Sequence, residues 1–216
     1  MAGEVEARLA ELALVPVIEI PDAKLAAPLA EALISGGLPC AEVTFRTPAA
    51  ADAIAVMAGY DMLVGAGTVL SPEQADLALD RGARFLVSPG LSAPVVRHVR
   101  KKAATMIPGV CTPTELELAI ADGIGLVKFF PAGPAGGVPY LKALCGPYRD
   151  ARFVPTGGIG PAELADYLAI PQVVAVGGSW MVPRDKIAKG EFPEIAALVA
   201  EAVAIARRLR SQAGGR

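Results

Sequence analysis

Lys128 is the side chain of this sequence best suited to covalent chemistry, because it is the only lysine inside a run that predicts a β-strand, LVKFFPA. Side chains of a strand alternate between its two faces, so Lys128 and Phe130 share one face. A lysine in a core loses hydration, which disfavours its charged form and leaves a nucleophilic amine. The pattern indicates an imine-forming lysine. The alternatives are a lysine paired with a buried carboxylate and one that extends out from the end of the strand.

A carboxylate and a guanidinium share one face of another strand-like run, CAEVTFRT, where Glu42, Thr44 and Arg46 alternate. Glu42 could move a proton, and Arg46 could bind a substrate carboxylate through two parallel hydrogen bonds. A purely structural ion pair between the two is the alternative. Glu19, in VPVIEI, could be a second acid or a partner of Lys128 or Arg46, but we favour a solvated position at the rim of the site.

Two glycine pairs, each beside a hydroxyl group, lie at the ends of the last two strand-like runs. They are Thr156-Gly157-Gly158 in PTGGIGP and Gly177-Gly178-Ser179 in VGGSWM. Glycine lets backbone N–H groups approach an anion closely, and a single such turn is weak evidence because many turns need positive φ. Two of them in neighbouring units predict a phosphate site.

The elements that must position these residues alternate along the whole chain. Eight runs rich in β-forming residues begin near Val15, Cys40, Met62, Arg84, Thr105, Gly125, Arg152 and Val173. Helix-like segments span 4–14, 22–35, 47–58, 71–81, 92–102, 112–122, 138–145, 160–168 and 193–210. Ser71-Pro72 and Thr112-Pro113 place a capping hydroxyl before proline, as at helix starts.

Eight strands that alternate with helices predict an α/β protein, a (β/α)8 barrel with an extra N-terminal helix. A doubly wound open sheet is the alternative, but the glycine-rich turn that such a fold carries after its first strand is absent from VPVIEIPD. Chemistry in such barrels is found at the carboxyl ends of the strands, where the residues named above fall.

Composition excludes several functional classes. The 216 residues carry a formal net charge of −2, which offers no general attraction for nucleic acid or an anionic membrane. The single histidine, His98, excludes zinc sites built on two or three histidines, and we expect no metal and no cofactor. Three scattered cysteines, an acidic N-terminus and the lack of a long apolar run predict a cytoplasmic protein. We expect one domain over 1–216, frayed at 211–216.

The motifs of this chain, in order, are EVTFRT, VGAGTVL, SPGL, IPGV-TPTE, KFFPA, GGV, GP, PTGGI and VGGSW-VP. This set resembles the bacterial 2-keto-3-deoxy-6-phosphogluconate (KDPG) and 4-hydroxy-2-oxoglutarate aldolases, from about Val15 to Pro183. KFFPA together with EVT-RT is specific to that family, whereas PTGGI and GGS are shared with many phosphate-binding barrels. The resemblance implies a barrel, a homotrimer, no metal, and a class I, imine-forming mechanism.

The resemblance also implies roles for individual residues. Lys128 would form the imine, and Glu42 would be the acid/base residue. The other implied contacts are Arg46 and Thr68 with the carboxylate end of pyruvate, Pro89 and Phe130 with the pocket wall, Thr156 with the substrate beyond the cleaved bond, and Gly157, Gly158, Gly178 and Ser179 with phosphate. Some relatives have a basic or neutral residue at the position of Glu19, and an acid there weakens the binding of a dianion.

The implied reaction is the reversible cleavage of KDPG to pyruvate and D-glyceraldehyde 3-phosphate. The same chemistry on the galactonate epimer or on 4-hydroxy-2-oxoglutarate is the nearest alternative. Two other classes remain open: a phosphate-binding barrel isomerase or synthase in which Lys128 is structural, and a non-catalytic binding module. A binding module would not need a lysine, a glutamate and an arginine that converge on one barrel mouth.

Overall fold

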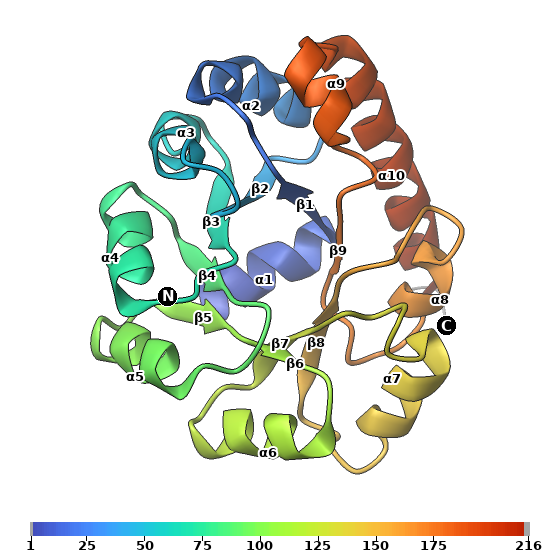
Figure 1. Cartoon of the computed structure of the whole chain (residues 1–216). Helices are drawn as coiled ribbons and strands as arrows, with labels where there is room; N and C mark the ends of the chain where they lie inside the picture. The colour runs from blue at the N-terminus through green and yellow to red at the C-terminus, as the bar shows by residue number, and fades with distance from the viewer. Residues whose placement is uncertain (1, 214–216) are drawn as a thin grey trace.

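Strands curve around a common axis and helices surround them in the computed structural model, which describes residues 2–213 (Figure 1). The strands are β1 (Leu14–Ile18), β2 (Cys40–Thr44), β3 (Leu63–Gly67), β4 (Phe85–Val87), β5 (Thr105–Ile107), β6 (Gly109–Val110), β7 (Leu126–Phe129), β8 (Arg152–Pro155) and β9 (Val176–Gly178). All their pairings are parallel. The predicted (β/α)8 barrel is therefore confirmed.

Closure of the barrel follows from the order of the strands. One sheet has the order β5-β4-β3-β2-β1-β9, and the other has the order β6-β7-β8. Two parallel bridges, Phe153↔Val173 and Thr156↔Gly177, join the β8 side to the β9 side. At the other junction β5 leads directly into β6, so the two sheets together enclose one interior.

The fifth predicted strand, TMIPGV, is divided by Pro108 into β5 and β6. Proline has no N–H and cannot donate within a ladder. Its carbonyl still accepts a hydrogen bond from Lys128 N at 2.9 Å, and Gly109 pairs with Lys128. The chain thus leaves β4 and joins β7 at this residue, and two short strands replace the one expected.

Ten α-helices and one 3-10 turn are formed by the described residues. They are α1 (Ala2–Leu12), η1 (Ala23–Leu25), α2 (Ala26–Ser35), α3 (Ala50–Met57), α4 (Pro72–Asp80), α5 (Ala93–Lys101), α6 (Pro113–Ala121), α7 (Gly137–Cys145), α8 (Leu164–Leu168), α9 (Arg184–Lys189) and α10 (Phe192–Ala213). Ser71 caps α4 by accepting a hydrogen bond from Gln74 N, and Thr112 and Glu115 form a capping box on α6, which confirms both predicted starts.

The helices differ from prediction in four places. Helix α9 was not predicted, and α8 is shorter than the predicted segment 160–168. Leu14 belongs to β1 rather than to the first helix. Of the tail predicted to be frayed, 211–213 continue α10, and 214–216 lie outside the described residues.

The extra N-terminal helix closes one end of the barrel. It leads directly into β1, so it covers the amino ends of the strands, and Figure 1 shows it across the middle of the ring. Leu9 is fully buried there and lines the interior together with Val15 and Phe85. The Phe85 ring occupies the space beside Gly65, where a Cβ would lie 2.3 Å from it. The accessible end of the barrel is therefore the carboxyl end.

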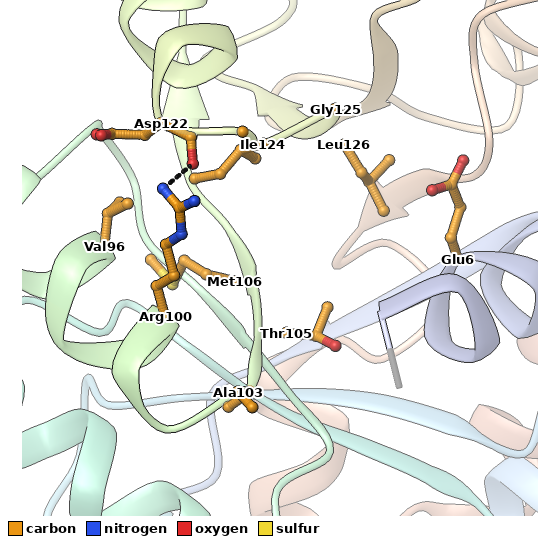
Figure 2. A pocket seen from close by; sticks show the side chains of 12 residues that line it. Glu6, Val96, Arg100, Ala103, Thr105, Met106, Asp122, Ile124, Gly125 and Leu126 are labelled. Atoms are coloured by element: carbon orange, nitrogen blue, oxygen red, sulfur yellow. Dashed lines mark hydrogen bonds between the residues drawn. The ribbon is translucent and has the colours of Figure 1, made fainter.

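A pocket of about 340 Å³ also lies at the amino end, around the starts of β5 and β7 (Figure 2). Arg100 donates a hydrogen bond to the carbonyl of Asp122 at 2.9 Å on one side of it, and Glu6 lies on the other. None of the residues predicted to do chemistry lines this pocket. Within residues 2–213, no helix combines the length and the apolar character needed to cross a bilayer.

Candidate active site

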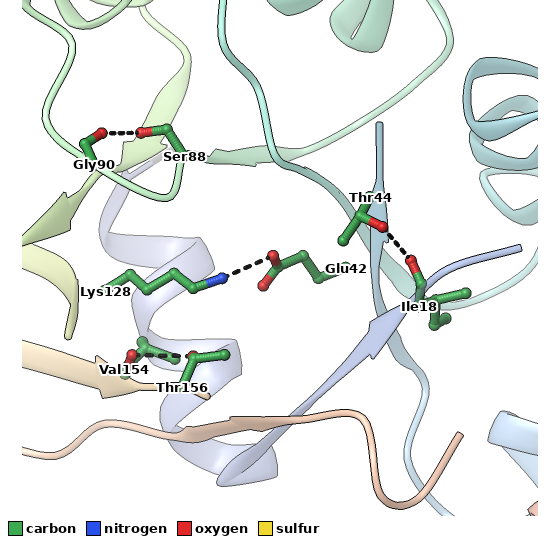
Figure 3. Close-up of polar contacts among 8 residues, drawn as sticks. All are labelled: Ile18, Glu42, Thr44, Ser88, Gly90, Lys128, Val154 and Thr156. Atoms are coloured by element: carbon green, nitrogen blue, oxygen red, sulfur yellow. Dashed lines mark hydrogen bonds and ion pairs between the residues drawn. The ribbon is translucent and has the colours of Figure 1, made fainter. Parts of the chain in front are cut away.

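Lys128 and Glu42 meet inside the barrel. Lys128 Nζ donates a hydrogen bond to Glu42 Oε1 at 3.2 Å, and the two residues are only 6% and 2% exposed (Figure 3). They come from β7 and β2, which the strand order places on opposite sides of the barrel. Their partnership spans 86 residues of sequence and the whole width of the interior.

This pairing decides between interpretations that the sequence left open. Glu42 pairs with Lys128, so the alternative of a structural ion pair between Glu42 and Arg46 is wrong. Lys128 does have a buried carboxylate partner, and it lies at the end of the barrel where the chemistry of such folds occurs. A buried amine and carboxylate in hydrogen-bond contact can exchange a proton, which both covalent and acid–base chemistry require.

One neighbouring residue contacts Lys128, and another leaves room for Glu42. The Phe130 ring centroid is 5.2 Å from Lys128 Nζ, within the range of a cation–π interaction. Gly67, next to Glu42 on β3, has no side chain, and a Cβ at that position would lie 2.3 Å from Glu42 Oε1. Gly67 was not predicted as a site residue, and its only signal in the sequence was a glycine inside the apolar run VGAG.

Hydroxyl groups around the pair bind to backbone carbonyls. Thr44 Oγ1 donates to Ile18 O at 2.7 Å, and Thr156 Oγ1 donates to Val154 O at 3.3 Å (Figure 3). Val154 pairs in register with Lys128, so Thr156 follows it on the same face of the sheet, toward the carboxyl end. Thr156 is therefore placed just beyond the amine, and it is almost fully buried.

Thr68, Pro89 and Phe130 are partly exposed at the carboxyl ends of β3, β4 and β7. Thr68 has φ of 57°, in the left-handed region that a β-branched residue rarely adopts. Val69 N, immediately after it, donates to Val87 O at 3.0 Å, which ties this turn to β4. The structure thus places the three residues at the mouth of the same barrel end as Lys128.

The two glycine-rich turns lie side by side, because Thr156 and Gly177 form a parallel bridge. Gly157 and Gly158 have φ of 94° and 72°, so this turn does need glycine. Gly178 does not have positive φ; it is required because a Cβ there would lie 1.7 Å from the Trp180 ring. A need for positive φ therefore accounts for the glycines of the first pair and does not account for Gly178.

Glu19 is bound at the mouth from two sides. Its Oε2 lies 3.8 Å from Arg46 Nη1, and its Oε1 lies 3.0 Å from Arg184 Nε. Its side chain is 26% exposed, so Glu19 does lie partly solvated at the rim, as favoured, and it is in addition a partner of Arg46. Arg184 was not predicted as a site residue, because it belongs to α9, which was not predicted.

The fold and this site define a barrel of the aldolase type, with an amine and a carboxylate buried together at its open end. The chain belongs to the KDPG and KHG aldolase family, whose model matches residues 5–198. A 2-dehydro-3-deoxy-phosphogluconate aldolase of Treponema pallidum is 50% identical over 88% of this chain and 91% of its own. A KHG/KDPG aldolase of Escherichia coli K12 is 44% identical over 88% of this chain and 90% of its own.

A solved structure supports the same assignment. The KDPG aldolase of Legionella pneumophila, crystallised with pyruvate captured at low pH as a covalent carbinolamine intermediate, has a TM-score of 0.88 and 40% identity. The match covers 91% of this chain and 97% of that one. The chain is therefore an aldolase, a carbon–carbon lyase, as the motifs EVT-RT and KFFPA predicted.

Proposed function

We propose that this protein is a class I aldolase that reversibly cleaves KDPG to pyruvate and D-glyceraldehyde 3-phosphate. The observation that carries the proposal is the buried contact of Lys128 Nζ with Glu42 Oε1 at 3.2 Å, at the open end of the barrel. Membership of the KDPG and KHG aldolase family supports the substrate class, and the carbinolamine in the Legionella relative supports the covalent step.

Lys128 begins the reaction as a neutral amine, after its proton has passed to Glu42 or to solvent. The amine attacks the C2 ketone to form a carbinolamine. The proton held by Glu42 or by solvent is returned to the carbinolamine hydroxyl, which leaves as water, so that Glu42 is a carboxylate again and the resulting iminium accepts electrons from the breaking C3–C4 bond. Glu42 takes the proton of the C4 hydroxyl as the aldehyde leaves. The resulting enamine is then protonated at C3 by the same carboxyl group, and water releases pyruvate and the free lysine.

The remaining residues bind the two ends of the substrate in this proposal. Arg46 and Thr68 bind the carboxylate of the pyruvyl part, while Pro89 and Phe130 form the wall of the pocket. Thr156, just beyond Lys128 on the neighbouring strand, contacts the part released as aldehyde. Backbone donors of the adjacent turns bind the phosphate; these turns contain Gly157, Gly158, Gly178 and Ser179.

Trapping of the imine tests the proposed function. Incubation with pyruvate and borohydride should leave a stable adduct that peptide mass spectrometry maps to Lys128. Lys128→Arg should abolish the adduct, whereas Lys142→Arg, at an exposed position of α7, should leave it unchanged. An adduct on another lysine would overturn the assignment of Lys128, and the absence of any adduct would favour a barrel enzyme in which this lysine is structural.

4-Hydroxy-2-oxoglutarate is the second candidate substrate, since the Escherichia coli relative is named for both activities. It has a carboxylate in place of the phosphorylated end, so the two candidates differ only in the part that the glycine-rich turns are proposed to bind. Comparing kcat/KM for the two substrates determines which one the protein prefers.

Three further expectations belong to the proposal. We propose a homotrimer, supported by the family resemblance alone, which sedimentation of the purified protein tests. The proposed domain is one barrel over 1–216, of which the family match covers 5–198. The proposed location is the cytoplasm, in keeping with Cys40, Cys111 and Cys145, which are all free thiols.

A further inference from the structure

Glu19 receives one arginine from each side at the open end of the barrel. β1, which it follows, lies between β2 and β9 in the sheet. Arg46 comes from the connection after β2, and Arg184 comes from the first turn of α9, which follows β9. Glu19, Arg46 and Arg184 therefore form a charged cluster. It extends from Arg46, which is proposed to bind the pyruvyl carboxylate, toward the turn that contains Gly178.

The charges of this cluster do not cancel. Two guanidinium groups and one carboxylate leave one net positive charge at the mouth. Glu19 alone would repel an anionic substrate, so a second cation is needed if the mouth is to attract one. Arg184 supplies that cation.

Arg184 also has donors available for a ligand. Its Nε faces Glu19 at 3.0 Å, its side chain is 66% exposed, and within residues 2–213 its terminal amino groups have no hydrogen-bond partner. A cation in the first turn of a helix is disfavoured by the helix dipole, so Glu19 rather than α9 attracts the guanidinium to the rim. The two terminal amino groups can bind a carboxylate or phosphate in the paired geometry that arginine favours.

The connection from β9 to Arg184 is compact, because Val182 N donates to Ser179 O at 3.1 Å. This turn returns the chain toward the barrel mouth immediately after the residues proposed to bind phosphate. We propose that Arg184 is a specificity-determining residue that binds the distal anionic group of the substrate, with Glu19 orienting it. The inference rests on the proposed function and adds a side-chain cation to a site otherwise made of backbone donors.

The test compares three substrates that share the pyruvyl end and differ in the charge of the distal end. These are KDPG with a phosphate, 4-hydroxy-2-oxoglutarate with a carboxylate, and 2-keto-3-deoxygluconate with a hydroxyl group. Arg184→Gln should lower kcat/KM about tenfold for KDPG, less for 4-hydroxy-2-oxoglutarate, and hardly at all for the uncharged end. Arg184→Lys should recover part of the loss, because it keeps the charge but not the paired geometry.

Arg81→Gln is the matched control, since Arg81 lies in an exposed ion pair with Asp52 at the end of α4 that leads into the amino end of β4. It removes the same charge and should leave all three kcat/KM values unchanged. A second comparison introduces Arg184→Gln into a Glu19→Gln background. A loss for KDPG should persist there, because the substituted amide oxygen can still accept a hydrogen bond from Arg184 Nε while the terminal amino groups bind the substrate.

Disappearance of that loss in the Glu19→Gln background would overturn the inference, because Arg184 would then only neutralise Glu19. Equal losses on all three substrates would overturn it as well. If the wild-type protein forms the pyruvate imine and prefers KDPG while Arg184→Gln keeps that preference, only this inference fails. If the wild-type protein forms no imine, the proposed function itself fails.

Discussion

Lys128 and Glu42 form a buried ion pair, and each offsets the free-energy cost of burying the other. Removing one partner of such a pair leaves an uncompensated charge and typically costs about 3–5 kcal/mol of stability. Substitutions that keep the shape and a hydrogen bond therefore separate catalysis from folding better than truncations do. The amide of glutamine meets this requirement at position 42.

Glu42→Gln should keep some imine formation with pyruvate but lower aldol cleavage and the exchange of pyruvate C3 protons by about 10² or more, because the amide cannot accept and return a proton. Proton exchange followed by NMR and cleavage followed by a coupled assay check this. Glu117→Gln, which changes an exposed carboxylate bonded to Tyr148, is the control and should have no effect. Proton exchange at the parental rate would assign the proton transfer to another group.

At the scale of elements, β3 contributes to the site through Gly67, which has no side chain and so leaves room for the Glu42 carboxyl group. Gly67→Ala would place a Cβ 2.3 Å from Glu42 Oε1, the oxygen that accepts the hydrogen bond from Lys128. We expect the carboxyl group to move and aldol cleavage to fall by up to about 10²-fold, since small misplacements of catalytic groups have effects of that size. Gly125→Ala, where nothing lies within 4 Å, should keep full activity. Unchanged cleavage in Gly67→Ala would show that the carboxyl group can shift without loss.

The turn after β8 should be the more informative of the two glycine turns. Gly158→Ala forces φ of 72° on an alanine, which costs about 1–2 kcal/mol, and a Cβ would contact Pro134 at 3.2 Å. We expect a lower melting temperature and a smaller ratio of kcat/KM for phosphorylated over unphosphorylated substrate, because the backbone donors move. The ratio cancels a general folding defect, and an unchanged ratio in a folded variant would remove this turn from the phosphate site.

Gly178 is a poorer position for the same experiment. A side chain there would collide with Trp180 and disturb the packing of the whole connection to α9. Loss of phosphate preference in a Gly178 variant would therefore not distinguish a lost donor from a displaced Arg184. The two turns look alike in sequence but require glycine for different reasons.

For the molecule as a whole, Cys40 predicts how stability depends on alkaline pH. Burial, with a smaller contribution from the charge of Glu42, raises the pKa of the Cys40 thiol from 9.0 to about 12. The folded protein therefore keeps a proton that the unfolded chain releases above pH 9. This stabilisation is complete below pH 9 and is lost as the pH rises toward 12, at about 1.4 kcal/mol per pH unit.

Cys40→Ala should accordingly show a shallower decrease in the free energy of unfolding above pH 9 than the parent, even if it is less stable at neutral pH. Urea unfolding at a series of pH values measures the slope. Cys111→Ala, at a partly exposed position, serves as the control and should keep the parental slope. Equal slopes for Cys40→Ala and the parent would contradict the prediction.

Local patterns in the sequence were sufficient to predict the architecture and the strands that carry Lys128 and Glu42. Alternating strand-like and helix-like runs predicted the barrel, because each element buries its own apolar face whatever its partners are. The two-residue period of a strand predicted that Lys128 shares a face with Phe130, whose ring centroid lies 5.2 Å from Lys128 Nζ. The same period was wrong for Arg46, because β2 ends at Thr44 and Arg46 lies in the turn that follows. The helix starts at Ser71 and Thr112 followed in the same way, because a cap bonds within its own first turn.

Which carboxylate meets which cation depended on the closed barrel. Glu42 pairs with Lys128, and Glu19 with Arg46 and Arg184, because β2 lies opposite β7 and β1 lies between β2 and β9. Pro108 divides a strand only because the chain changes its pairing partner there, and Gly67 matters only because Glu42 comes next to it. These contacts join segments far apart in sequence, and their geometry depends on strand register around the ring, which no local pattern encodes.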